Sequence, residues 1–275
     1  MKKDLTKGTE WKVILLFALP IMGSGLLQIC YNLADSIVVG NFVGPDALGA
    51  IGVTGSTTWL LLNIVTGIGT GTSIAISQYF GAKREKDIIA AASTVIIFSI
   101  GLSLLVSALC FIFARSILVG FLNTPPEMYA DSYSYFVIYG SGIIFQMIYN
   151  VVYGILRAHG NSKGSLIFLL VAAILNVALD LLFVVVFKWG VKGAAIATII
   201  SQAGSAAASV IYMHKLLPQF RFKRNEWVFD IAKLKVILNL AIPIILQSSI
   251  IAFGFIILQR LVNSFGPASI QGYVA

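Results

Sequence analysis

Seven long runs of predominantly apolar residues constrain this chain more than any other feature. A helix needs roughly 20 such residues to cross about 30 Å of hydrocarbon. None of the runs alternates polar and apolar residues as barrel strands do. Since only 11% of the 275 residues are charged, the runs exclude an ordinary soluble domain and predict an all-α integral membrane protein. They lie near residues 13–39, 48–79, 88–114, 133–156, 164–187, 193–213 and 236–264.

The basic residues predict the orientation of these spans. Most of the 19 Lys and Arg residues fall before the first span, between the second and third, between the fourth and fifth, or in segment 214–235. By the positive-inside rule these segments, including the amino terminus, face the cytoplasm. The first run is too long for a signal peptide and lacks a cleavage pattern. We therefore expect a multi-pass protein of the plasma membrane, surrounded by the lipid bilayer. Its net charge of +8 reflects topology and does not indicate a nucleic-acid partner.

A pattern in the first span recurs in the seventh. FALPIM at 17–22 corresponds to LAIPII at 240–245, and the Gly-Pro pair at 44–45 corresponds to the pair at 266–267. Six spans followed by the same pattern predict a duplicated six-helix unit whose copies have parallel orientation.

This repeat predicts three parts of the chain. Residues 1–213 form an amino-terminal six-helix transmembrane lobe, 214–235 a cytoplasmic basic linker, and 236–275 the first helix of an incomplete second lobe. The missing second lobe is thus an expected partner. The linker is expected to contain some amphipathic helix, and its basic residues could also bind anionic headgroups.

Only two acidic residues, Asp35 and Asp180, lie well inside the spans, and the first six spans contain no Lys or Arg. A carboxylate at membrane depth costs at least a few kcal/mol, so it normally faces a cavity and binds protons, ions or substrate. The alternative is an aspartate near a helix end that neighbouring donors hold.

Further polar residues share helix faces with these acids. Asn176 and Asp180 stand four residues apart on one face, and an amide oxygen beside a carboxylate is a partial site for a hard cation. The fourth span carries a polar stripe and the sixth adds two residues. Such a surface can bind flat organic cations, or it can simply join helices. The stripe comprises Tyr135, Tyr139, Gly142, Gln146, Asn150 and Tyr153, and the sixth span adds Thr198 and Gln202.

Other motifs argue against catalysis. The Gly67-x-x-x-Gly71 spacing in the second span predicts close helix packing, and GIGTG at membrane depth is not a dinucleotide loop. No Ser-His-Asp set, metal-ligand cluster or Walker sequence occurs. We therefore expect no enzyme activity, no cofactor and no metal other than a possible Na⁺.

Three segments together resemble the multidrug and toxic compound extrusion (MATE) family of antiporters. They are ALPIMGSGLLQICYNLADSIVVG with the exit VGPDALGAIG (18–52), Asn176-x-x-x-Asp180, and GAAIAT ending at Thr198. The resemblance covers the whole chain. It implies twelve helices in two six-helix lobes when complete, of which this chain would be the amino-terminal lobe and helix seven.

The resemblance also implies a cation site built from Asp35, Asn176, Asp180 and Thr198, which H⁺ or Na⁺ would occupy. Two desolvated carboxylates repel one another, so the pair is expected to share a proton or bind Na⁺. Neutralising the pair would shift the first helix near Pro20, where proline removes a helix hydrogen bond, and favour release of an exported organic cation. The surrounding cavity or polar network would contain Gln28, Asn32, Tyr135, Tyr139, Gln146 and Asn150.

Two other functions stay open. A flippase of the same superfamily would move lipid-linked oligosaccharides or another anionic lipid, but it would favour Arg or Lys inside the cavity. A non-transporting membrane receptor or scaffold is disfavoured by the cytoplasmic amino terminus and the buried acids. The residue types do not distinguish H⁺ from Na⁺.

Overall fold

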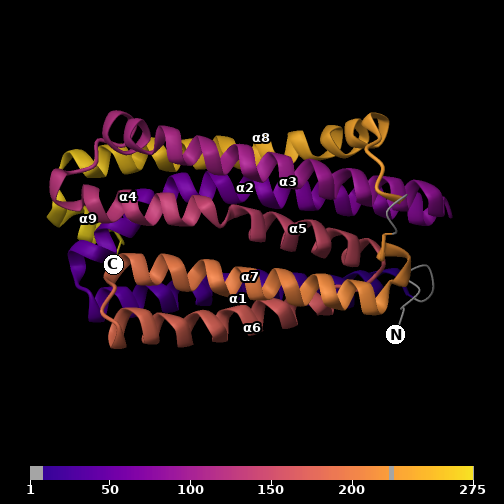
Figure 1. Ribbon diagram of the computed structural model, residues 1–275, viewed down its shortest axis with the longest axis horizontal. Helices are drawn as coiled ribbons and strands as arrows, with labels where there is room; N and C mark the ends of the chain where they lie inside the picture. The colour runs from indigo at the N-terminus through magenta and orange to yellow at the C-terminus, as the bar shows by residue number, and fades with distance from the viewer. Residues whose placement is uncertain (1–8, 223–225, 275) are drawn as a thin grey trace.

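The computed structural model describes residues 9–222 and 226–274, and helices dominate these ranges (Figure 1). The seven expected apolar runs all coincide with helices, which confirms the all-α class. The elements are α1 (Glu10–Phe42), α2 (Pro45–Gly81), α3 (Glu85–Arg115), the π-helical η1 (Ser116–Phe121), α4 (Pro126–Ser141), α5 (Ile143–Ala158), α6 (Lys163–Asp180), the π-helical η2 (Leu181–Val186), α7 (Gly190–Leu216), the 3₁₀ turn η3 (Pro218–Phe220), α8 (Ile231–Ser264) and α9 (Pro267–Val274).

Within the described residues, five helical segments are long and apolar enough to span a membrane. They are α2, α3 with η1, α6 with η2, α7 and α8, and the pair α4 and α5 adds a sixth if it counts as one span. The first expected run lies within α1, a continuous helix of 33 residues. Large apolar side chains on the outer helix faces are exposed, as a lipid-facing surface requires.

The fourth expected span is bent, whereas the sequence predicted one helix over 133–156. α4 and α5 meet at a 43° angle around Gly142. A Cβ atom at Gly142 would lie 2.5 Å from Cγ1 of Ile199, and one at Gly140 would lie 2.8 Å from Cβ of Cys110. Close packing on both sides therefore requires glycine at positions 140 and 142. A Gly-Ser-Gly sequence is also a weak point at which helices kink.

The connections fall at two opposite ends of the bundle. The start of α1, the α2–α3 turn, the α5–α6 turn and the path from α7 to α8 lie at one end, and the other connections lie at the opposite end (Figure 1). The described basic connections thus share one end, as the orientation argument requires. Lys2, Lys3, Lys7, Lys223 and Arg224 lie outside the described residues.

Helix α2 holds the bundle together through glycines on two faces. A Cβ at Gly71 would lie 2.7 Å from Cβ of Ala241 and 2.9 Å from the carbonyl oxygen of Ile237, both on α8. Gly67 likewise faces Ile245 of α8, so the expected close packing at these two glycines is confirmed. On another face, Gly154 of α5 contacts the backbone of α2. Only residues without side chains allow such close approach.

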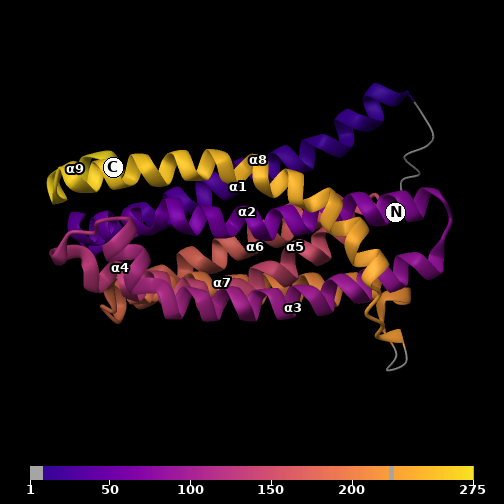
Figure 2. The ribbon, with the colours of Figure 1, turned by 90° about the horizontal axis from the view of Figure 1, so that it is seen from above.

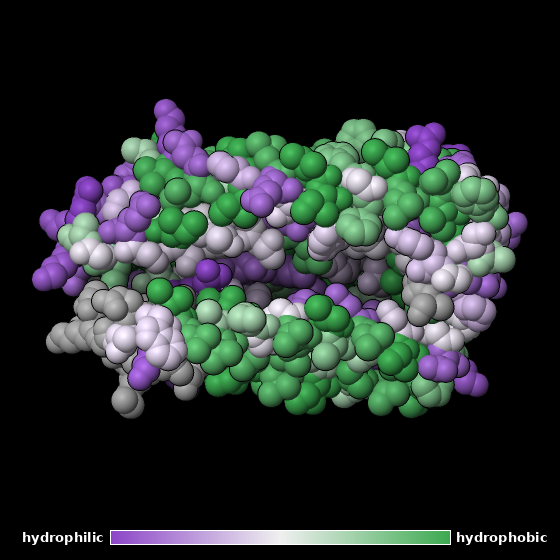
Figure 3. All heavy atoms as spheres, turned by 180° about the vertical axis from the view of Figure 1, so that it is seen from behind, coloured by the Kyte–Doolittle hydropathy of each residue, from purple (hydrophilic) through white to green (hydrophobic). Residues whose placement is uncertain are grey.

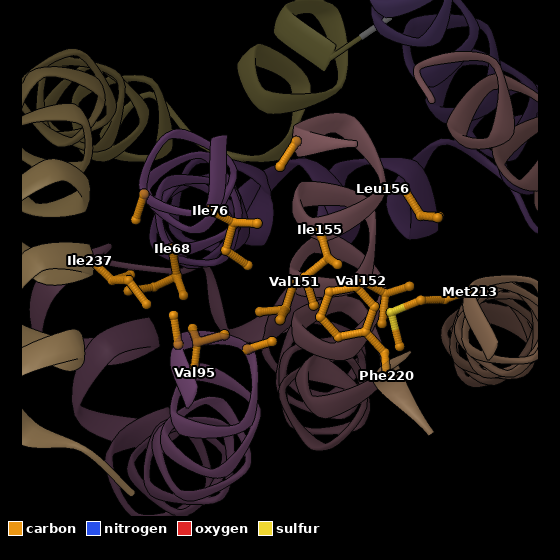
Figure 4. Packing of buried hydrophobic residues seen from close by; sticks show 14 of the residues in the cluster. Ile68, Ile76, Val95, Val151, Val152, Ile155, Leu156, Met213, Phe220 and Ile237 are labelled. Atoms are coloured by element: carbon orange, nitrogen blue, oxygen red, sulfur yellow. The ribbon is translucent and has the colours of Figure 1, made fainter. Parts of the chain in front are cut away.

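An apolar core joins α2 to α3, α5, α7 and α8 (Figure 4). Its largest fully buried side chains include Ile68, Ile76, Ile155 and Leu156. Phe220, from the connection between α7 and α8, is completely buried in the same cluster. This aromatic anchor fixes the connection against the helix ends.

The described part of the linker also bonds to α3. The Ser93 hydroxyl donates to the carbonyl oxygen of Val228 at 3.0 Å and accepts from its N–H at 2.9 Å, while Thr94 Oγ1 accepts from the N–H of Asp230 at 3.0 Å. A salt bridge joins Lys233 to Asp87. Of the predicted linker 214–235, residues 214–216 belong to α7 and 231–235 to α8. The described residues between them form only the η3 turn and a single further 3₁₀ position.

The corners after α1 and α8 share one backbone geometry. Gly44 has φ +119° and Gly266 has φ +87°, a region that favours glycine, and each is followed by a proline that begins the next helix. The repeated sequence therefore forms the same local turn twice. The division into lobes stays a prediction.

The close crossing of α2 and α5 predicts a specific effect of adding one methyl group. Gly154→Ala would place its Cβ against the backbone oxygen of Gly69, which cannot move like a flexible side chain. We expect the free energy of unfolding to fall by about 1–3 kcal/mol, measured by thermal unfolding in detergent. Gly101→Ala on α3 is the control: its added Cβ would meet no neighbouring atom within 4 Å, so the change should be neutral or slightly stabilising. An equal fall in the free energy of unfolding in Gly154→Ala and Gly101→Ala would contradict this account of the packing.

Candidate cation site

Two buried carboxyl groups from α1 and α6 lie side by side. Asp35 is 8% exposed and Asp180 is fully buried. Their side chains are close enough to interact directly, and α1 and α6 run along one another in the bundle (Figure 1). Because lipid-embedded helices cannot hydrate such groups, the pair needs a proton, a cation or hydrogen-bond donors.

An amide and a hydroxyl complete the group of four residues. Asn176, one turn before Asp180 on α6, donates from Nδ2 to Oγ1 of Thr198 on α7 at 3.5 Å. The Thr198 hydroxyl donates in turn to the carbonyl oxygen of Ala194 at 3.0 Å. These bonds leave the amide oxygen of Asn176 free to bind a cation. The structure thus brings Asp35, Asn176, Asp180 and Thr198 together, and their role in cation binding stays a prediction.

Most oxygen atoms of this group lack a well-formed hydrogen bond among the described residues. Asp35 Oδ1, Asn176 Oδ1, both carboxyl oxygens of Asp180 and the Tyr31 hydroxyl are buried without one, although Asp35 lies close to Asp180 and Tyr31 lies close to Thr198. An unsatisfied buried polar group costs about 1–3 kcal/mol, more when charged. Such a concentration is the mark of a ligand site, because native structures satisfy almost all buried polar groups. Carboxylate, amide and hydroxyl oxygens suit a proton or a hard monovalent cation.

Three tyrosines surround the carboxylates. Tyr31, Tyr135 and Tyr139 are each less than a tenth exposed, and all three lie within electrostatic range of Asp35. The rings of Tyr135 and Tyr139 stack with centroids 5.9 Å apart. Tyr31 was not among the predicted site residues. Its position four residues before Asp35, on the same face of α1, was the available signal.

The bend between α4 and α5 divides the predicted polar stripe. Tyr135 and Tyr139 on α4 lie at the carboxylates, and the Tyr139 hydroxyl donates to Gln146 Oε1 at 3.5 Å. Asn150 lies farther along α5, where its amide donates to the backbone oxygen of Gln146 at 2.9 Å and its backbone contacts Gly69. The stripe thus links the site to the α2–α5 crossing.

The other predicted residues lie on α1. Gln28 is half-buried and donates to the exposed Asn32 at 3.4 Å, so these two amides pair with one another. Pro20 interrupts the hydrogen bonding of α1 without breaking the helix, and the Ser24 hydroxyl donates to its carbonyl oxygen at 2.8 Å. Their cavity and hinge roles stay predictions.

The helix changes its winding directly after Asp180. α6 ends at this residue and the π-helical η2 continues from Leu181. π-helical turns are rare and frequent at functional sites, because the wider turn alters how side chains are presented. No pattern in the sequence indicates this change.

A second polar region lies nearer the end of the bundle that carries the basic connections. Arg157 of α5 lines a cavity of about 380 Å³ with Ser73, Ser77 and Gln78 of α2, and its buried Nε has no partner among the described residues. The molecule is hollowed along its middle between two hydrophobic bands, with hydrophilic residues in the hollow (Figure 3). The sequence placed Arg157 just outside the fourth span, whereas α5 includes it.

Comparison with known proteins now decides the family. The MatE family model matches residues 20–182, a segment that contains Asp35, Asn176 and Asp180. The chain belongs to the MatE family. Members of this family are transporters, so the fold and the membrane assignment agree with the comparison.

Curated relatives extend over nearly the whole chain. The Probable multidrug resistance protein YpnP of Bacillus subtilis is 33% identical over 274 residues, which cover 99% of this chain and 60% of that protein. The Multidrug export protein MepA of Staphylococcus aureus is 26% identical, with 97% of this chain and 59% of that protein covered. The chain thus spans about three fifths of the length of the curated relatives it matches.

A solved structure supports the same fold. A transporter of the MOP superfamily from Pyrococcus furiosus superposes with a TM-score of 0.80 at 26% identity, covering 89% of this chain and 54% of that one. That transporter is described as having a binding pocket of reverse polarity, which suggests a different function. The shared fold is therefore established.

The unpaired oxygens predict that a cation stabilises the chain. Binding to the folded state at ten times its Kd adds about 1.4 kcal/mol of stability. We expect the thermal unfolding midpoint in detergent to rise with Na⁺ or with acidification, and this response to disappear in Asp35→Asn and Asp180→Asn. Asp131→Asn, which alters an exposed acid on α4, should respond like the wild type. If the unfolding midpoints of Asp35→Asn and Asp180→Asn both rise with Na⁺ or acidification as much as that of the wild type, the site is refuted.

Proposed function

We propose that this chain is the cation-coupling lobe of a secondary active transporter that exports small organic cations, including drugs, in exchange for H⁺ or Na⁺. The single observation that carries the proposal is the pair of buried, incompletely bonded carboxyl groups of Asp35 and Asp180 at membrane depth. Uncompensated charge there is unfavourable, so the pair has a strong affinity for cations. The names of YpnP and MepA, which refer to multidrug resistance and multidrug export, support the direction and the substrate class.

The membrane setting follows from the same features. The chain would lie in the plasma membrane with the amino terminus in the cytoplasm, since the described basic connections share one end of the bundle. A second lobe would complete the translocation path, because the chain spans only about three fifths of its relatives.

Coupling would pass through α1. Without a bound cation, the two carboxylates repel one another and favour separation of α1 from α6; a proton or Na⁺ neutralises the pair and draws the helices together. Pro20 lies 15 positions before Asp35, and the missing backbone hydrogen bond allows α1 to bend there. Bending would move the Tyr31 side of α1 relative to Tyr135 and Tyr139, and so change the surface offered to a cationic substrate.

One observation favours a second candidate, a flippase for an anionic lipid such as a lipid-linked oligosaccharide. Arg157 and three polar residues of α2 line a cavity. Arg157 is half-buried, its guanidinium lies over the Tyr153 ring, and its Nε has no hydrogen bond to a described residue, so it suits a phosphate. Arg157 and its cavity involve α5 and α2, whereas the carboxylates belong to α1 and α6. Because neither carboxylate lines this cavity, export of cations is the stronger proposal.

The decisive experiment reconstitutes the full transporter that contains this chain in proteoliposomes and follows ethidium under a separate pH gradient or Na⁺ gradient. We expect movement driven by at least one gradient, reduced at least about ten-fold in Asp35→Asn and Asp180→Asn, since each variant removes one of the coupled charges. Pro20→Ala should retain the cation response but transport more slowly. Asp131→Asn is the matched control with unchanged transport.

Two results would overturn the proposal. Unchanged coupled transport in both buried variants would remove the carboxylates from the mechanism. No ethidium movement, together with lipid scrambling that Arg157→Gln abolishes, would establish the flippase instead.

A further inference from the structure

A cavity separate from the candidate cation site lies among α3, α5, α7 and the linker. Its volume is about 470 Å³, within the usual range for a small-ligand site. The walls are apolar and include Ile96 of α3, Ile148 and Val152 of α5, and Val210 of α7. Part of the adjoining core, with Val151, Val152, Met213 and Phe220, is seen in Figure 4.

The cavity borders an exposed apolar face of the bundle. Ile100, which lines it, is 37% exposed, and Leu104, one turn farther along α3, is 58% exposed. Apolar exposure of this extent continues along α3. Hydrocarbon chains therefore have direct access to the opening.

Charged and polar groups stand at the linker side of the cavity. Arg221 and His214 line it, and Arg221 Nε donates to the backbone oxygen of His214 at 2.9 Å. This bond orients the exposed guanidinium and uses only one of its five N–H donors. The remaining donors suit the planar, charge-assisted contacts that arginine makes with phosphate.

An unpartnered hydroxyl lies deeper in the cavity. Ser99 is only 1% exposed, and its Oγ has no hydrogen bond to any described residue. It stands six residues beyond Ser93, the residue of α3 that bonds to the linker at Val228, and six helical residues rise about 9 Å. A hydroxyl that lines the cavity deeper in the bundle than this contact with the linker can hydrogen-bond to an ester group of a lipid whose phosphate lies at Arg221.

The linker beside the cavity has the composition of a membrane interface. Four nearly consecutive apolar side chains are exposed by 46–62%: Trp227, Val228, Phe229 and Ile231. Aromatic residues concentrate at the headgroup level, and nearby basic residues attract anionic lipids. This continuous apolar and basic surface favours a lipid over a protein or a soluble metabolite.

We propose that the cavity binds one anionic phospholipid of the adjacent leaflet, with its phosphate on Arg221, its ester region near Ser99 and an acyl chain among α3, α5 and α7. The bound lipid connects the linker to three helices of the lobe. This site is independent of the transported substrate.

The test measures lipids retained by the purified chain. The chain is equilibrated in mixed micelles of equal phosphatidylglycerol and phosphatidylcholine, and bound lipid is counted by native mass spectrometry. We expect one phosphatidylglycerol per chain, preferred over phosphatidylcholine. Arg221→Gln should reduce this preference about five-fold, the effect of one interfacial charge. Lys215→Gln, which removes an exposed basic residue that does not line the cavity, is the matched control.

A second pair of variants tests the cavity itself. Val210→Phe fills the space and should abolish retention, whereas Ile211→Phe, at a neighbouring exposed position, should not. Three results would each overturn the proposal. The wild type could retain both lipids equally, Lys215→Gln could lose as much of the preference for phosphatidylglycerol as Arg221→Gln, or a folded Val210→Phe chain could retain the lipid in full. If Val210→Phe does not fold, the comparison of the Arg221 and Lys215 variants decides alone.

Discussion

Two carboxylates buried beside one another in a lipid-embedded bundle are the main physical constraint on this structure. Asp35 on α1 and Asp180 on α6 cannot both stay charged there without compensation, and the described side chains do not provide it. Asn176, Thr198 and the tyrosines supply a polar lining without a cation of their own. In the proposed mechanism the compensation is a proton or cation that exchanges with the surroundings, and its binding would be coupled to the position of α1.

Helices α5 and α8 both pack closely against α2, whereas α1 has fewer close contacts with α2. Gly67 and Gly71 of α2 lie against α8, and Gly154 of α5 lies against α2, so these helices meet nearly backbone to backbone. α1 packs mainly along α6, and Figure 2 shows it diverging from α2 at its start. Pro20 is on this less supported helix. In the proposed mechanism, a change at Asp35 would move α1 while the α2 contacts stay closed.

The sequence was sufficient for the features that depend on hydropathy and charge. Span length predicted the helices, and the rarity of acids within spans identified Asp35 and Asp180. The Gly-Ser-Gly sequence marks a weak point in the fourth span, but hydropathy alone does not show a bend, and the close approach of Ile199 to Gly142 comes from another helix. Arg157 was missed because spans were bounded by hydropathy, whereas the helix continues past the last apolar residue.

The most direct test of the central claim is whether the two carboxyl groups act as one site. Infrared difference spectroscopy can follow the protonated carboxyl band against pH in the wild type, Asp35→Asn and Asp180→Asn. A coupled pair predicts that removing either acid shifts the titration midpoint of the other by more than about one pH unit. If each acid titrates at the same midpoint with and without its partner, the shared cation site does not exist.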